Sequence, residues 1–203
     1  MSGHLMETAH MRMTPRRDGT PSDTARANEI LAELRREIAG YTDYRAAVAD
    51  GYRQFLPGIP QKVYHFTNYG RAARQALSFD AAKPTSLLYE SLPDGGYKLV
   101  GAMYTAPARA SAEKLDARVP LSIAQWHLHT NLCFPPRNAP QRFSETRNGR
   151  PLFGPKGSVA SKSECDAAGG RFFERLFGWM LHVNPYEKDA ASVWGSNTSE
   201  MKH

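Results

Sequence analysis

The chain has 203 residues, a mass of 22.6 kDa and a formal net charge of +6. Its hydrophobic content of 41% is enough for a sizeable core, so neither disulfides nor a metal ion are needed merely for folding. A membrane-spanning helix is excluded because no run of about 18 apolar residues occurs. The 26 Lys and Arg residues are dispersed and form no nucleic-acid-binding module, so we expect a solvated basic surface and no nucleic-acid partner.

Residues 1–21 mix His, Met, Arg, Gly and Pro without a period, and we expect a flexible amino-terminal arm. His10-Met11-Arg12-Met13 offers soft sulfur donors of the kind that copper(I) prefers, although a disordered arm without that role is the preferred interpretation. Ser22-Asp23 then provides an N-cap for a helix that ends at Gly40. Its apolar residues recur at helical spacing: Ala27, Ile30, Leu31, Leu34 and Ile38. A shorter helix is expected from Thr42 to about Gly51.

Strand-like alternation begins at residues 62–67 and recurs in three later segments. Residues 86–104 predict a hairpin, because Pro93-Asp94-Gly95-Gly96 supplies the positive φ angles of a tight connection. Leu121–Cys133 predicts a strand with Gln125, His127, His129, Asn131 and Cys133 on one face. Residues 178–184 alternate as well, with Met180, His182 and Asn184 on one face. Short helices are expected at 69–76 and after Ser111.

The segment 134–164 is rich in Pro, Gly, Arg and Asn and predicts a long loop, followed by a short helix capped by Ser161 and Glu164. Cys133 and Cys165 are too few for a structural zinc site and form no CxxC motif. A disulfide between them is the preferred interpretation, and two free thiols are the alternative. The bond would pin the loop and would place the protein outside the reducing cytosol.

These elements predict one α+β domain over residues 22–195, with a frayed tail at 196–203. The helices of the first third are expected to pack on an antiparallel sheet, for which a barrel is one possible form.

Three strand-like segments place a His opposite bulky apolar residues, which suggests that the His faces converge. Buried imidazoles are costly unless they are hydrogen-bonded or coordinated, and neutral imidazole is the commonest metal ligand. We therefore predict one transition-metal ion, zinc, copper, iron or manganese, on a mononuclear site. The predicted ligands are His65, Glu90, His127, His129 and His182. Gln125, Asn131 and Asn184 are expected to hydrogen-bond these ligands and fix their tautomers.

An ion with an open coordination position would make the protein a metalloenzyme acting on a small-molecule substrate, with Glu90 or His65 as general base. The alternative is a metal-free module that binds a small polar ligand on the same His, Asn and Gln face. A serine hydrolase and an H-E-x-x-H metalloprotease are excluded because both motifs are missing. The sequence does not define the oligomeric state.

Five segments together resemble an uncharacterised family of bacterial proteins that usually carry an export signal and have no established activity. These segments are YHFTNY (64–69), LLYE (87–90), GAMYTAP (101–107), WHLHTN (126–131) and FGWMLHV (177–183). The resemblance covers the chain from about residue 10 onward and implies a periplasmic or secreted protein. It also supports the disulfide, and its shared positions match His65, Glu90 and His129.

Overall fold

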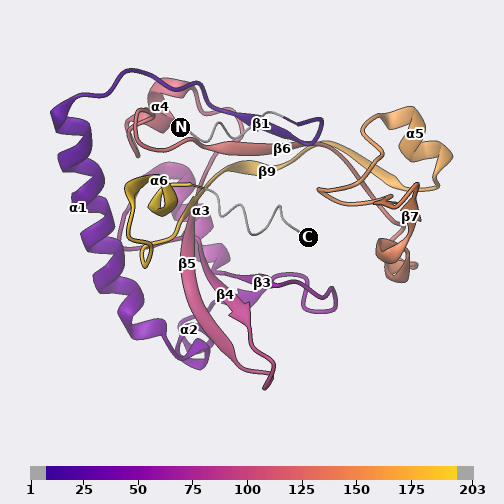
Figure 1. The fold of residues 1–203 in the computed structure, drawn as a ribbon, viewed down its shortest axis with the longest axis horizontal. Coiled ribbons are helices and arrows are strands. Elements are labelled where there is room, and N and C mark those ends of the chain that lie inside the picture. The colour runs from indigo at the N-terminus through magenta and orange to yellow at the C-terminus, as the bar shows by residue number, and fades with distance from the viewer. Residues whose placement is uncertain (1–7, 196–203) are drawn as a thin grey trace. The chain divides into compact units, whose positions relative to one another are not determined.

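The computed structural model describes residues 8–195 and has the predicted α+β fold (Figure 1). Seven strands follow the order β1-β6-β9-β5-β4-β3-β2 in an antiparallel sheet. This sheet is open rather than closed into a barrel. The predicted tail at 196–203 and the first seven residues of the predicted arm lie outside the described residues.

The chain divides into two compact units where the sequence predicts one domain. The first unit comprises the residues up to Met13 together with His127–Trp179, and the second comprises Thr14–Trp126 and the residues from Met180 onward. The long strand β9 (Arg171–Val183) contributes residues to both units. Each unit is assembled from segments that are discontinuous in the chain.

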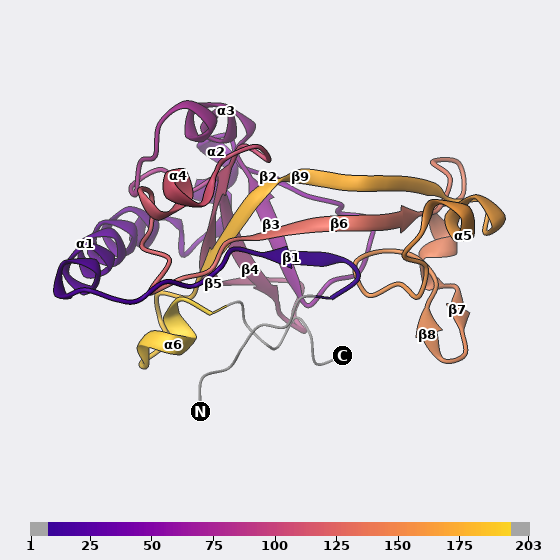
Figure 2. The ribbon, with the colours of Figure 1, turned by 90° about the horizontal axis from the view of Figure 1, so that it is seen from above.

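The first unit consists mainly of strands. Its elements are β1 (Met11–Met13), β6 (His127–Phe134), η2 (Pro140–Ser144), β7 (Thr146–Arg147), β8 (Arg150–Pro151), α5 (Lys162–Ala167) and most of β9. Figure 2 shows β1 and β6 side by side, and Met13 pairs with His127 in antiparallel register. Part of the expected flexible arm is therefore a strand of the sheet. Three residues are too few to show a period in the sequence.

The second unit contains most of the helices. Its elements are α1 (Pro21–Ile38), η1 (Ala39–Tyr41), α2 (Tyr44–Ala49), β2 (Arg53–Gln54), β3 (Val63–Thr67), α3 (Tyr69–Leu77), β4 (Ser86–Ser91), β5 (Tyr97–Ala106), α4 (Ala112–Asp116), the end of β9, and α6 (Ala190–Val193). The predicted hairpin is confirmed as β4 and β5, and the helix after Ser111 is confirmed as α4.

Helix α1 begins at a capping box rather than at the predicted cap. The Thr20 hydroxyl accepts from the Asp23 N–H, and the Asp23 carboxylate accepts from the Thr20 N–H. The prediction of Ser22-Asp23 as N-cap is thus wrong, because Pro21 already has the φ that suits a first helical position. The second helix, predicted from Thr42, begins at Tyr44 with Asp43 as its N-cap.

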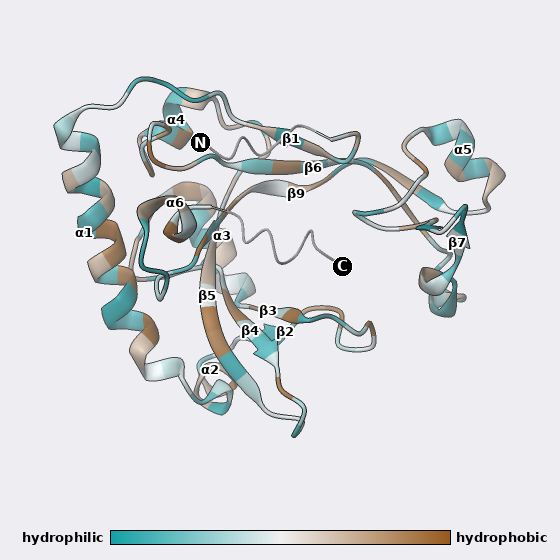
Figure 3. Cartoon of the chain, viewed as in Figure 1, coloured by the Kyte–Doolittle hydropathy of each residue, from teal (hydrophilic) through white to brown (hydrophobic). Residues whose placement is uncertain are grey.

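The core of the second unit lies between the apolar side of α1 and one face of the sheet. Figure 3 shows brown and teal residues on different sides of α1, and Leu34 and Ile38 are fully buried. Burial of each such side chain contributes roughly 1.5–3 kcal/mol. Buried tyrosine hydroxyls donate to main-chain carbonyls, as Tyr52 does to Pro84 at 2.9 Å and Tyr104 to Ala81 at 2.6 Å. Burial raises the pKa of both phenols, so they remain neutral donors.

The predicted disulfide is confirmed between Cys133 and Cys165, which are both buried. It anchors a small apolar cluster that includes Phe153 and Val159. Ser161 caps α5 as predicted. The long loop also contains the hairpin β7–β8, whose Asn148-Gly149 connection has positive φ at both residues.

The strand predicted over Leu121–Cys133 is observed as β6, which begins at His127 and not at Leu121. The carbonyl of Pro120 accepts hydrogen bonds from the N–H groups of Ile123 and Ala124, so this segment forms a local turn. The predicted strand alternation is also broken at Asn131, which has φ +53°. The expectation that residues 125 to 133 share one continuous face is therefore wrong at both ends.

Candidate metal centre

Two of the predicted ligands meet in the second unit. His65 on β3 and His182 at the end of β9 have their Nε2 atoms 3.3 Å apart. Their ring centroids are 5.3 Å apart, and the ring planes are inclined by 45°. His182 is buried and His65 is half-buried. The two residues are separated by 117 positions in the chain, and only the folded sheet brings them together.

Gly101 on β5 makes this approach possible. It lies opposite Leu88 of β4, which in turn lies opposite His65 of β3. A Cβ atom at position 101 would lie 2.6 Å from the Val183 carbonyl oxygen and 3.3 Å from Oδ1 of Asn184. The missing side chain therefore lets the end of β9 pass close to β5, so that His182 reaches His65.

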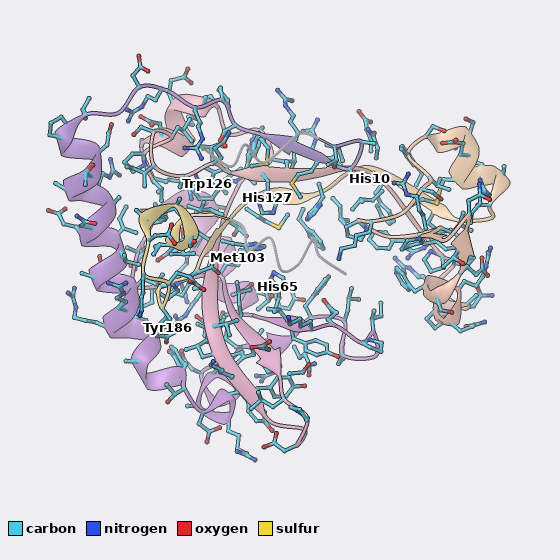
Figure 4. All side chains as sticks on the ribbon, in the orientation of Figure 1. His10, His65, Met103, Trp126, His127 and Tyr186 are labelled. Carbon is cyan, nitrogen blue, oxygen red and sulfur yellow. A yellow bond between two sulfur atoms is a disulfide. The ribbon has the colours of Figure 1, made fainter. Side chains whose placement is uncertain are left out.

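Two thioethers lie on the same face as this imidazole pair. Met103, Met180 and Leu88 form a buried apolar cluster against which Val63 and Val100 pack. Met180 precedes His182 by two residues on β9, and Met103 lies opposite Ser86, which pairs with Thr67 on β3. Figure 4 labels His65 and Met103 in this part of the second unit.

The other predicted histidine pair belongs to the first unit. His127 and His129 project from β6 with ring centroids 5.4 Å apart and ring planes at 79°. His127 is buried and His129 is half-buried. Across the strand pair, Met13 lies opposite His127 and Met11 lies opposite His129. Directly opposed residues of antiparallel strands point to the same face, so two imidazoles and two thioethers form one block.

Glu90, the predicted carboxylate ligand, lies on β4 of the second unit and is half-buried. It pairs with Val63 on one side and Lys98 on the other. Leu88, opposite His65, precedes it by two residues on the strand, so Glu90 belongs to the neighbourhood of the His65–His182 pair. Its role as a ligand stays a prediction.

The three amides predicted to support the ligands all bond to the main chain. Gln125 Nε2 donates to the Thr14 carbonyl at 2.7 Å, and Asn131 Nδ2 donates to the Ala9 carbonyl at 3.2 Å. Asn184 Nδ2 donates to the carbonyls of Ser192 and Gly195 at 3.0 and 2.8 Å. Each amide thus links two segments of its own unit by hydrogen bonds. The predicted contact of these amides with a ligand ring stays a prediction.

His10 is the remaining histidine of the described chain, and it has a structural environment. Its Nδ1 lies 2.9 Å from the Asn131 carbonyl oxygen, and its Nε2 lies 2.8 Å from the Gly157 carbonyl oxygen. Carbonyl oxygens only accept hydrogen bonds, so both ring nitrogens are directed at the backbone. His10 joins the amino-terminal segment to the long loop within the first unit and offers a control for the other four histidines.

Geometry gives a test of fit for a metal ion. Two nitrogens bound at about 2.0–2.1 Å to a tetrahedral ion lie about 3.3–3.4 Å apart, which matches the separation of the His65 and His182 Nε2 atoms. Within residues 8–195, however, no three His, Cys, Asp or Glu side chains gather into a metal-holding group. An imidazole pair would need further donors of another kind, and the methionines beside each pair are sulfur donors.

Arg17 is the centre of an ion-pair cluster in the second unit. Arg17 donates to Asp23 at 2.7 and 2.8 Å and to Asp116 at 2.7 Å. The guanidinium holds the pKa of both carboxyls below their usual range. Surface hollows of about 430 and 410 Å³ occur, one in each unit; Met11 lines the one in the first unit, and none of the five predicted ligands lines either. We assign the Arg17 cluster to stability rather than to ligand binding.

Sequence reasoning missed Gly101, Met103 and Met180, and it set Met11 and Met13 aside. The alternation at 178–184 did place Met180 on the face of His182, so this signal was present. The pairing of Met11 with His129 could not be predicted, because a local sequence pattern does not determine the register between strands that are 118 residues apart.

The chain matches no protein-family model, no curated protein and no solved structure. The resemblance to exported bacterial proteins thus stays a prediction. Within the described residues, no helix is long and apolar enough to cross a membrane.

Proposed function

We propose that the protein is an exported transition-metal-binding protein in which His65 and His182 form the imidazole core of a metal site. The observation that carries the proposal is the 3.3 Å separation of their Nε2 atoms, which suits two nitrogen ligands of one ion. The burial of His182 supports it, because a buried imidazole is stabilised by coordination. The disulfide supports export, because such bonds persist in oxidising compartments.

Of the other predicted ligands, Glu90 belongs to the same unit as His65 and His182, whereas His127 and His129 form a pair of their own in the first unit. An ion at His65 and His182 with an open position would polarise a bound substrate or water, and Glu90, left uncoordinated, would be the general base. The ion itself, zinc, copper, iron or manganese, follows from the donors that complete the site.

A metal-free binding module is the second candidate. The same 3.3 Å separation also suits a hydrogen bond in which one neutral ring donates its N–H to the other. In that case the His face would bind a small polar ligand without an ion.

The test compares the intact chain with the double variant His65→Ala/His182→Ala. Zinc(II) and copper(I) affinities are measured by competition with a chromophoric chelator after the protein has been stripped of metal. Loss of hydrogen-bond partners behind metal ligands alone costs roughly 10–100-fold in affinity, so loss of two ligands should cost at least that much.

His10→Gln is the matched control, because both nitrogens of His10 face carbonyl oxygens. We expect its metal affinity to equal that of the unmodified chain. Equal affinities and equal numbers of bound ions in all three proteins would contradict the proposal for His65 and His182. A chain that binds neither ion would favour the metal-free module.

A further inference from the structure

We propose that Met11 and Met13 are thioether ligands which, with His127 and His129, give the first unit a copper(I) site. This inference rests on the proposed function and names the ion and two further ligands. Neither methionine belongs to the predicted ligand set. The inference starts from the strand register, which is fixed by the pairs Met11↔His129, Arg12↔Leu128 and Met13↔His127.

The register places all four donors in one block on one face of β1 and β6. Directly opposed side chains have Cβ atoms about 4.5–5.5 Å apart, and residues two apart along a strand are about 6.6 Å apart. Methionine is long and has three rotatable bonds, so its sulfur can adjust within such a block. Arg12 projects to the opposite face and is exposed, so no cation of β1 lies among the four donors.

Burial is uneven across the block. Met13 and His127 are buried, whereas Met11 and His129 are half-buried. Met13 and His127 would therefore hold the ion away from water, and Met11 and His129 would lie where the ion enters the site. Burial of Met13 alone has the ordinary explanation of core packing, so the inference rests on its position opposite His127.

The donor chemistry selects the ion. Thioether sulfur is a soft ligand that favours copper(I), whereas zinc is bound in proteins by thiolate, imidazole and carboxylate. The two cysteines are joined in the disulfide and supply no thiolate. Every methionine of residues 8–195 lies in a group that accompanies a histidine pair, because Met103 and Met180 lie beside His65 and His182 in the second unit.

The first experiment measures copper(I) and zinc(II) affinities of the full chain and of Met11→Leu/Met13→Leu. Leucine keeps the volume and removes the sulfur. We expect the copper(I) affinity to fall at least 10-fold and the zinc(II) affinity to stay within about 3-fold, on the scale of ligand-environment effects in metal sites. Arg12→Gln, on the same strand but the other face, is the matched control and should bind copper(I) as the unmodified chain does.

The second experiment needs no variant to fold. In a methyl NMR spectrum of protein labelled with carbon-13 at the methionine methyl groups, saturation with copper(I) should shift the signals of Met11 and Met13. Unshifted Met11 and Met13 signals, or an equal copper(I) affinity in the leucine variant, would overturn the thioether ligands and leave the proposed function standing. If the chain binds neither copper(I) nor zinc(II), the proposed function fails and this inference fails with it.

Discussion

The two units carry similar donors but assemble them differently. In the first unit, His127 and His129 are neighbours on one strand and face Met13 and Met11 directly across a strand pair. In the second unit, His65 and His182 come from strands far apart in the chain and meet because Gly101 has no side chain. Strand register brings His127 and His129 together with the methionines, whereas a close approach of two backbone segments brings His65 and His182 together.

The same contrast applies to what holds each unit together. The first unit has a disulfide beneath its long loop, and its buried cluster is small. The second unit has the long helix α1, the main body of buried tyrosine, leucine and isoleucine side chains, and the Arg17 ion pairs. We therefore expect changes in one unit to be felt chiefly in that unit.

The largest expected effect follows from removing the disulfide. Cys133→Ala/Cys165→Ala opens a loop with a sequence separation of 32 residues. The chain-entropy relation gives a loss of about 3–4 kcal/mol in the free energy of unfolding. Hydrogen exchange should quicken at the amides of Gly154 and Gly170, which donate to the carbonyls of Cys133 and Cys165.

The strand pairs β3–β4 and β4–β5 of the second unit serve as the internal control for that experiment. Their amides should keep the exchange rates of the unmodified protein under native conditions. Equally faster hydrogen exchange in both units would show that the disulfide stabilises the chain as a whole. It would contradict the expectation that a change in one unit affects chiefly that unit.

A smaller effect is expected for Gly101→Ala in the second unit. The new methyl group would lie 2.6 Å from the Val183 carbonyl oxygen, and backbone must move to relieve the contact. Overpacking of this kind costs about 1–3 kcal/mol, which denaturant unfolding would measure. The shift of β9 should also separate His182 from His65 and weaken metal binding.

Gly58→Ala is the matched control, because no atom lies within 4 Å of a Cβ built there. Its free energy of unfolding should stay within about 0.5 kcal/mol of the unmodified chain, as for most surface substitutions. If Gly101→Ala is equally neutral, the close approach of β9 to β5 is not what positions His182.

The smallest expected effect concerns acid. Arg17 lowers the pKa of Asp23 and Asp116, so these carboxylates contribute stability above the ordinary carboxyl pKa of about 3.9 and lose it as the pH falls toward their lower folded values. The midpoint temperature of thermal unfolding should therefore decrease as the pH is lowered below about 4. Arg17→Gln should lower this midpoint at pH 6 and should make its decrease in acid less steep. An equally steep decrease in the variant would contradict the role given to Arg17.

Part of the fold and part of the candidate site could be predicted from the sequence. The α+β fold, the disulfide and the hairpin β4–β5 follow from periodicity, cysteine count and turn residues. The alternating positions of His65 and His182 were also visible, because parity along a strand is local. Their meeting was not predictable, since it depends on how closely β9 approaches β5 at Gly101.

Local exceptions explain the remaining differences. Positive φ at Asn131 interrupts the alternation on which the predicted face of residues 125–133 depended. The Pro120 carbonyl diverts the segment before β6 into a turn. Strand β1 has three residues, and its partner β6 lies more than a hundred residues later, so neither length nor pattern distinguished it from a flexible arm.

The central claim is that His65 and His182 bind one ion through their facing nitrogens. The most direct measurement is a ring-nitrogen NMR correlation of the full chain, recorded before and after addition of zinc(II) or copper(I). Coordination predicts large shifts of Nε2 in both His65 and His182, while the ring of His10, held between two carbonyl oxygens, stays unchanged. Unshifted Nε2 signals of His65 and His182 at saturating metal would contradict the claim.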